Sequence, residues 1–122
     1  MVERSQADEP SVISHVVLMK PRADLSPDDR VAFIGAFARA LKEIPMVRGV
    51  RIGRRVVHAA NYESLGPDAD YLAIIDFDDV AALKAYLAHP AHHELGRRFS
   101  ETLSSAMVYD FEVGGFEMLQ VD

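Results

Sequence analysis

The chain has 122 residues, which is enough for one domain with its own core and too few for a second. Nineteen acidic residues against 13 basic ones give a net charge of -6, so the field repels phosphate backbones and anionic lipid, and we expect no nucleic-acid partner. No stretch approaches the roughly 18 apolar residues of a membrane span, and the lack of cysteine excludes disulfides, thiolate zinc sites and cysteine nucleophiles. We therefore expect a soluble, cytoplasmic protein with no membrane partner.

The first half of the chain predicts a tail, a strand and a helix. Residues 1–11 are polar and predict a short frayed tail. The β-branched residues between Ile13 and Lys20 predict a strand that the following proline ends. Ser26 followed by proline and then Asp29 is a helix start, and this helix should end at Pro45. Its apolar residues recur at helical spacing: Val31, Phe33, Ile34, Phe37, Leu41 and Ile44.

Two further strands and a loop follow. Residues from Val47 to His58 alternate loosely with arginines and predict a second strand with one wet face. These arginines should face solvent or another subunit. Asn61 to Asp68 contains Gly-Pro and predicts a loop, and Tyr71 to Phe77 predicts a third strand.

Pro90 separates two predicted helices, because proline breaks a helix interior. The first helix is capped by Asp78 or Asp79 and should end near Ala88, and the second should begin at Pro90. Val108 to Val113 predicts a fourth strand, followed by a tail from residue 115. Apolar residues at helical spacing mark the second helix: Leu95, Phe99, Leu103 and Met107.

This order of elements indicates an α+β fold, a ferredoxin-like split βαβ domain over residues 12–114 with an antiparallel sheet and helices on one face. The first and third strands are apolar on both alternations. The face without helices therefore needs a partner, and a second sheet packed against it would supply one. We expect a homodimer with a barrel-like interface.

Side chains able to transfer protons cluster around Pro90, where Tyr86, His89, His92 and His93 fall within eight residues. A histidine and a tyrosine can together orient and transfer a proton near neutral pH. His92 should lie near a helix N-terminus, where the dipole disfavours the imidazolium and leaves a neutral ring able to accept a proton. The structural alternative is that Tyr86 and His92 only fix the corner through hydrogen bonds or packing.

The other histidines have less specific roles in the sequence. His89 precedes proline and should cap the corner or contact ligand, whereas His93 should face solvent. A metal site built from these histidines and Glu94 is disfavoured, because neighbouring corner positions diverge and no His-Glu-x-x-His helix is present. His15 should face either the helices or a dimer partner, and it shares its alternation with Tyr71, so both could border one cavity.

Four features together resemble the stress-responsive A/B barrel (Dabb) family from about His15 to Val113: His15, Ile44-Pro45, Tyr71 to Phe77, and Tyr86-x-x-His89-Pro90-x-His92. The resemblance implies a dimeric α/β barrel. A plant polyketide cyclase of this family closes a linear polyketide by aldol chemistry without metal or organic cofactor, and by motif match its acid-base pair would be Tyr86 and His92. Tyr71 stands where that enzyme has a histidine.

We therefore expect a small, partly apolar carbonyl or aromatic ligand between sheet and helices. Tyr86 and His92 would be catalytic in aldol, cyclisation or isomerisation chemistry, His15, Tyr71 and His89 would bind substrate, and no metal or cofactor would be needed. The alternatives are a non-catalytic stress-associated protein that self-assembles or sequesters ligand, and a cofactor-free oxygenase. A cavity enclosed by His15, Tyr71, Tyr86 and His92 would favour an enzyme, and a filled core would favour assembly.

Overall fold

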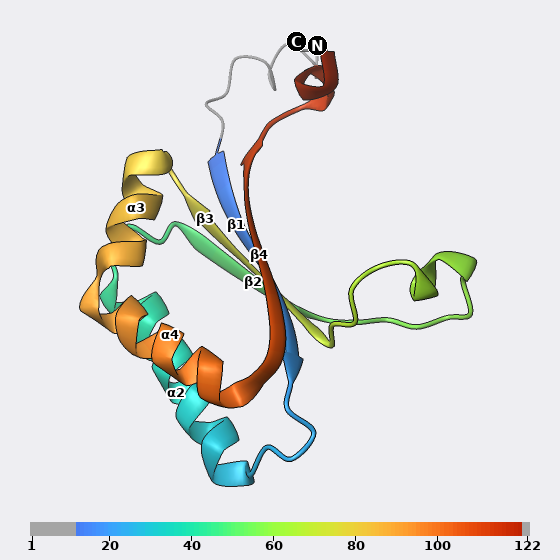
Figure 1. Cartoon of the computed structure of the whole chain (residues 1–122). Coiled ribbons are helices and arrows are strands. Elements are labelled where there is room, and N and C mark those ends of the chain that lie inside the picture. Colours follow the sequence, from blue (N-terminus) through green and yellow to red (C-terminus); the bar gives the residue numbers. More distant parts are fainter. Residues whose placement is uncertain (1–11, 121–122) are drawn as a thin grey trace.

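A computed structural model describes residues 12–120 as one sheet with helices packed on one of its faces (Figure 1). The predicted tail at 1–11 lies outside the described residues. In chain order the elements are β1 (Val12–Pro21), α2 (Pro27–Glu43), β2 (Gly49–Arg54), the 3₁₀ helix η1 (Asn61–Ser64), β3 (Tyr71–Phe77), α3 (Val80–Ala88), α4 (Pro90–Thr102), β4 (Leu103–Val113) and the 3₁₀ helix η2 (Phe116–Gln120).

The sheet has four antiparallel strands in the order β2-β3-β1-β4. This arrangement confirms the predicted ferredoxin-like α+β fold. β1 lies between β3 and β4, and His15 is paired with Ile75 on one side and with Asp110 on the other. Because paired residues share a face of the sheet, these three side chains all point toward the helices.

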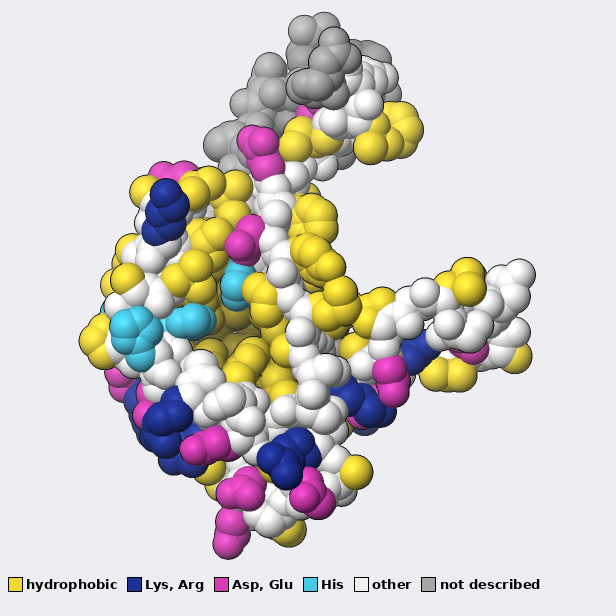
Figure 2. Space-filling view, in the orientation of Figure 1, with side chains coloured by type: hydrophobic (Ala, Val, Ile, Leu, Met, Phe, Trp, Pro, Cys, Tyr) yellow, Lys and Arg dark blue, Asp and Glu magenta, His cyan; other side chains and the backbone are white. Residues whose placement is uncertain are grey.

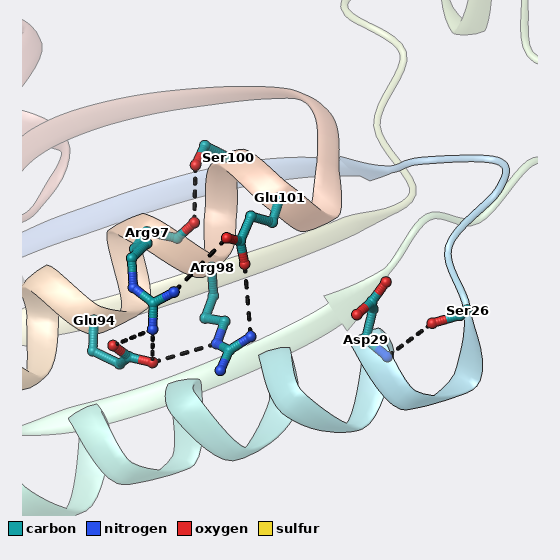
Figure 3. Close-up of polar contacts among 7 residues, drawn as sticks. All are labelled: Ser26, Asp29, Glu94, Arg97, Arg98, Ser100 and Glu101. Carbon is teal, nitrogen blue, oxygen red and sulfur yellow. Dashed lines mark hydrogen bonds and ion pairs between the residues drawn. The ribbon is translucent and has the colours of Figure 1, made fainter.

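Each of the three α-helices begins at the residue type that the sequence predicts, whereas η1 and η2 fall in the predicted loop and tail. The Ser26 hydroxyl accepts a hydrogen bond from the Asp29 N–H at 3.1 Å at the start of α2 (Figure 3). The Asp79 carboxylate caps α3 in the same way. At the corner, Pro90 is the first residue of α4 and His89 is its cap.

The second and fourth strands differ from the sequence prediction. β2 is shorter than the predicted Val47 to His58, because its pairing with β3 ends at Arg54, opposite Tyr71, and the chain then leaves the sheet. β4 begins at Leu103 rather than Val108. Met107 pairs with Leu18 of β1, so sheet pairing prevails over the helical spacing of Leu103 and Met107.

The core lies between the sheet and the helices. Its largest fully buried side chains are Tyr86, Phe77, Ile44 and Ile75. α4 packs beside α2 and presents an exposed ladder of charges to solvent, in which Glu94 binds Arg97 and Arg98 (Figure 3). Such surface pairs contribute little stability one by one, so burial accounts for most of the packing energy.

Among the described residues, no helix covers the face of the sheet opposite α2, α3 and α4 (Figure 1), and this face is mostly apolar, with Ser14 and Asp76 as a hydrogen-bonded polar pair. The segment 55–70, which we call the arm, projects from this side of the molecule between β2 and β3 (Figure 1). Side chains on the open face come from three strands: Val16, Leu18, Leu72, Ile74, Met107, Tyr109, Phe111 and Val113. Within residues 12–120, no helix has the length and apolar character needed to cross a membrane.

Candidate functional site

A cavity of about 180 Å³ lies between the sheet and the two helices of the proline corner, and we call it the corner cavity. It brings together three of the residues singled out in the sequence, His15, Tyr86 and His92. Figure 2 shows the hollow on this side of the molecule, with an apolar floor and histidine side chains beside it. The other lining residues are mostly apolar: Val17, Phe37, Ile75, Leu87, Leu95, Gly96, Phe99 and Val108.

His15 enters the corner cavity from β1, facing the helices. Its side chain is 7% exposed, and Nδ1 lies 2.6 Å from Oδ1 of Asp110 on β4. Because an ionised carboxylate only accepts hydrogen bonds, Nδ1 carries the proton and donates it to Asp110. The carboxylate therefore fixes the tautomer and leaves Nε2 as the second functional nitrogen of the ring.

Tyr86 forms the centre of an aromatic cluster on α3. The residue is 1% exposed, and its ring centroid lies 4.9 Å from that of Phe77 and 4.7 Å from that of His92. His15 packs edge-on against the same ring at 5.9 Å. Burial raises the pKa of Tyr86 to about 12, so the phenol stays protonated at neutral pH and can donate a hydrogen bond.

The Tyr86 hydroxyl forms no hydrogen bond with another described residue. In the described part of the chain, every fully buried side-chain nitrogen or oxygen has a hydrogen-bond partner. The Tyr86 oxygen has none, so it is not fully buried. The oxygen therefore keeps some exposed surface, and Tyr86 is one of the residues that line the corner cavity. A buried hydroxyl normally finds a partner, so this arrangement leaves the phenol free for a ligand.

His92 lies on the first turn of α4 and is half-buried. Burial is the main cause that lowers its pKa below the ordinary value of 6.5. The charges of His15 and His93 act in the same direction, and a hydrogen bond with the Leu87 backbone opposes them. The ring is therefore neutral at physiological pH, as the sequence predicts. The main cause of the lowered pKa is burial, whereas the sequence analysis attributed it to the helix dipole.

The remaining sequence candidates lie elsewhere. His89 accepts a hydrogen bond from the Ala91 N–H at Nδ1 (3.0 Å), so its ring caps α4 and does not line the corner cavity. His93 is exposed, as expected. Tyr71 borders a different cavity, so only three of the four residues expected around one cavity meet there.

That second cavity, of about 440 Å³, lies between α2 and the β1–β3 end of the sheet, and we call it the apolar cavity. Phe37 lines both cavities, so the two lie next to each other. Arg30, Tyr71 and Thr102 are its polar residues. Apolar side chains form the remaining lining: Met19, Pro21, Leu25, Phe33, Ile34, Ala38, Leu41, Ile52 and Leu103.

Sequence comparison agrees with this architecture. The family profile described as Stress responsive A/B Barrel Domain matches residues 13–113. The chain belongs to the stress responsive A/B barrel domain family. No protein with a curated description matches it by sequence.

Solved structures of similar fold come from bacteria and plants. A protein from Thermobifida fusca, described as a dimeric ferredoxin-like protein of unknown function, is 21% identical, with a TM-score of 0.67 over 86% of this chain and 93% of that chain. A hydroxynitrile lyase from Passiflora edulis is 16% identical, with a TM-score of 0.73 over 86% and 95%. The cofactor-independent oxygenase SnoaB from Streptomyces nogalater is 16% identical, with a TM-score of 0.60 over 84% and 93%. At these identities the likeness establishes the shared fold.

Asp110 is the site residue that sequence reasoning missed. No motif marks it, because it is one acidic residue in the predicted fourth strand. The signal is topological: once β4 is placed beside β1, the register sets Asp110 opposite His15. Among residues 12–120, no three histidine, aspartate or glutamate side chains are arranged to hold a metal ion.

Proposed function

We propose that this Dabb protein binds a small, partly apolar carbonyl or aromatic compound and carries out cofactor-independent acid-base chemistry of the aldol, cyclisation or isomerisation type. The observation that carries the proposal is the Tyr86 hydroxyl, which lies in a lined cavity with no protein partner among the described residues, beside a neutral His92. An acid and a base of different proton affinity in one apolar cavity suit proton transfer.

In the proposed reaction, His92 removes a proton from the carbon next to a substrate carbonyl. The electron pair of the broken C–H bond forms an enolate, and the Tyr86 hydroxyl donates a hydrogen bond to the developing oxygen anion. In an aldol closure, the enolate carbon then attacks a second carbonyl of the same molecule, and the protonated His92 returns its proton to the new alkoxide. No redox step occurs, so the protein's own groups suffice.

The two cavities suggest how such a ligand would lie. The reacting carbonyl would occupy the corner cavity, and an apolar ring or chain would extend past Phe37 into the apolar cavity. His15 would contact the ligand through Nε2 while Asp110 holds its other nitrogen. A mostly apolar site with few convergent polar groups is typical of small-molecule binding. The hydroxynitrile lyase and the oxygenase among the structural neighbours support an enzymatic use of this fold.

The same proposal includes a homodimer. The open sheet face is apolar over three strands, and Tyr109 and Phe111 are each about half exposed there. Solved relatives are described as dimeric ferredoxin-like proteins. Packing the open faces of two copies together would bury both and form a barrel-like interface.

The test is turnover of a panel of linear β-keto compounds and aromatic hydroxynitriles, followed by mass spectrometry of the products. Tyr86→Phe and His92→Gln should each lower kcat/KM by about 10²- to 10⁴-fold on a compound that the wild type converts. Matched controls are Tyr62→Phe and His93→Gln, which change the same residue types at exposed positions. If these controls lose as much as the cavity variants, the assignment is wrong. If no compound turns over or binds, the acid-base proposal is overturned.

A further inference from the structure

The apolar cavity has one basic lining residue, Arg30, and no acidic one among the described residues. Apart from Arg30, Tyr71 and Thr102, its lining is apolar. The Arg30 side chain is exposed to solvent and forms no ion pair or side-chain hydrogen bond with another residue between 12 and 120. A guanidinium beside an apolar cavity, without a counterion, is suited to recognise an anionic group on an apolar ligand.

Stability of α2 does not account for Arg30. The residue lies in the first turn of the helix, where a positive charge opposes the helix dipole and acidic residues such as Asp28 and Asp29 favour it. An ion pair along the helix would need an acidic residue three or four positions away. The residues at those positions carry no charge: Ser26, Pro27, Phe33 and Ile34. Arg30 is therefore free to bind a group from outside the chain.

Tyr71 supplies a second polar group to the apolar cavity. It is half-buried at the start of β3, and its hydroxyl forms no hydrogen bond with another described residue. A phenol can donate one hydrogen bond to a carboxylate, and a guanidinium can donate two in a planar fork. The chain as a whole carries a net charge of -6, so an anion would be held by these local donors and not by the overall field. The two side chains suit a carboxylate that is attached to an apolar body.

The two cavities follow one another along the strands. On β3, Ile75 lines the corner cavity and Tyr71, four residues earlier, lines the apolar cavity, a separation of about 13 Å in a strand. On α2, Phe37 lines both cavities and Arg30 lies seven residues earlier, which is about 10 Å along a helix. The first turn of α2 follows the end of β1 at this end of the sheet (Figure 1). The carbonyl and the anion of one ligand would therefore stand about 10–13 Å apart.

We propose that the substrate is a long-chain oxo acid, whose carbonyl lies beside Tyr86 in the corner cavity and whose carboxylate binds Arg30 and the Tyr71 hydroxyl. The inference rests on the proposed function and names the class of its substrate. An extended carbon chain advances about 1.2 Å per bond, because the three backbone bonds of a residue span about 3.5 Å. About eight to eleven bonds should therefore separate the two carbonyl carbons. Arg30 determines specificity at the far end of the ligand and does not touch the reacting atoms.

Calorimetric titration with 10-oxoundecanoate and its uncharged match, 10-oxoundecanamide, tests the proposal. At neutral pH the wild type should bind the acid about tenfold more tightly than the amide, because a hydrogen bond to a charged group contributes about that factor. Arg30→Gln should abolish this preference. The control is Arg39→Gln, which removes an exposed arginine two and a half turns further along α2, on the opposite side of the helix. This variant should keep the preference of the wild type, and circular dichroism checks that each variant folds.

Further variants separate the two ends of the ligand. Tyr71→Phe should weaken binding of the acid about threefold, and Arg30→Lys, which keeps the charge without the planar fork, should retain part of the preference. Tyr86→Phe should weaken the acid and the amide equally, by about three- to tenfold, because both present the same ketone.

Three results would overturn the oxo-acid assignment. Equal affinity for acid and amide, or a preference that survives Arg30→Gln, would do so and leave the proposed function standing as long as Tyr86→Phe still weakens both probes. Binding of the acid that depends on Arg30 and not on Tyr86 would show that the ligand of the apolar cavity does not reach the corner cavity. Failure of both probes to bind would also exclude long-chain oxo acids, whereas the proposed function is judged by its own panel of compounds.

Discussion

Replacing Tyr86 with phenylalanine removes a single oxygen atom that has no hydrogen-bond partner among the described residues. The ring contacts with Phe77, His15 and His92 remain. Because no hydrogen bond is lost and no buried group is left unpaired, the free energy of unfolding should change by no more than about 0.5 kcal/mol. Tyr86→Ala deletes the ring from a position that is 1% exposed and should cost about 3–5 kcal/mol.

Urea denaturation followed by circular dichroism measures both values, at one protomer concentration because dimerisation adds to apparent stability. If Tyr86 has a structural role, its hydroxyl should contribute to the free energy of unfolding. If the hydroxyl serves to bind a ligand, its removal should leave the free energy of unfolding almost unchanged. A loss above about 1 kcal/mol in Tyr86→Phe would show that the hydroxyl is hydrogen-bonded within the protein. That result would refute the interpretation of the phenol as a free donor in the corner cavity.

Two more predictions concern the histidines of the corner. The folded protein lowers the pKa of His92, so below the ordinary value of 6.5 the unfolded chain binds more protons and the free energy of unfolding falls as pH drops. His92→Gln should flatten that fall in urea titrations between about pH 5 and 7.5, and an unchanged slope would contradict the assigned burial. His89→Ala removes the cap of α4 and should lower the free energy of unfolding by about 0.5–2 kcal/mol. His93→Ala, at an exposed position, should change it by no more than about 0.5 kcal/mol in the same assay. Equal losses in the two variants would show that the cap is not at His89.

The sequence anticipates those parts of the fold where local signals agree with tertiary packing. Ser26, Asp79 and Pro90 mark helix starts that the structure confirms, because capping is a property of a few neighbouring residues. The sequence places Met107 and residues 55–58 wrongly, because the start of β4 depends on pairing with a strand far away in the sequence and β2 pairs with β3 only as far as Arg54. Long-range pairing is not visible in local spacing.

In the candidate site too, contacts between residues close in sequence could be predicted, and contacts that depend on long-range strand pairing could not. Tyr86 and His92 are close in sequence, so their meeting could be predicted from the helix corner alone. The place of His15 depends on which face of β1 the helices cover, and the sequence left this open between helices and partner. Asp110 requires the register of β1 with β4, and Tyr71 shares an alternation with His15 yet borders another cavity. Alternation assigns a face of the sheet, and position along the strand decides the cavity.

The proposed function requires that the corner cavity receive a carbonyl ligand. A crystal structure of the protein soaked with 1-phenyl-1,3-butanedione, an aromatic β-diketone, tests this claim most directly. We expect one carbonyl oxygen within about 2.6–3.2 Å of the Tyr86 hydroxyl, with the His92 ring in reach of the carbon between the carbonyls. Clear density for the probe elsewhere on the protein, or a corner cavity closed by protein side chains around a hydrogen-bonded Tyr86, would contradict the account.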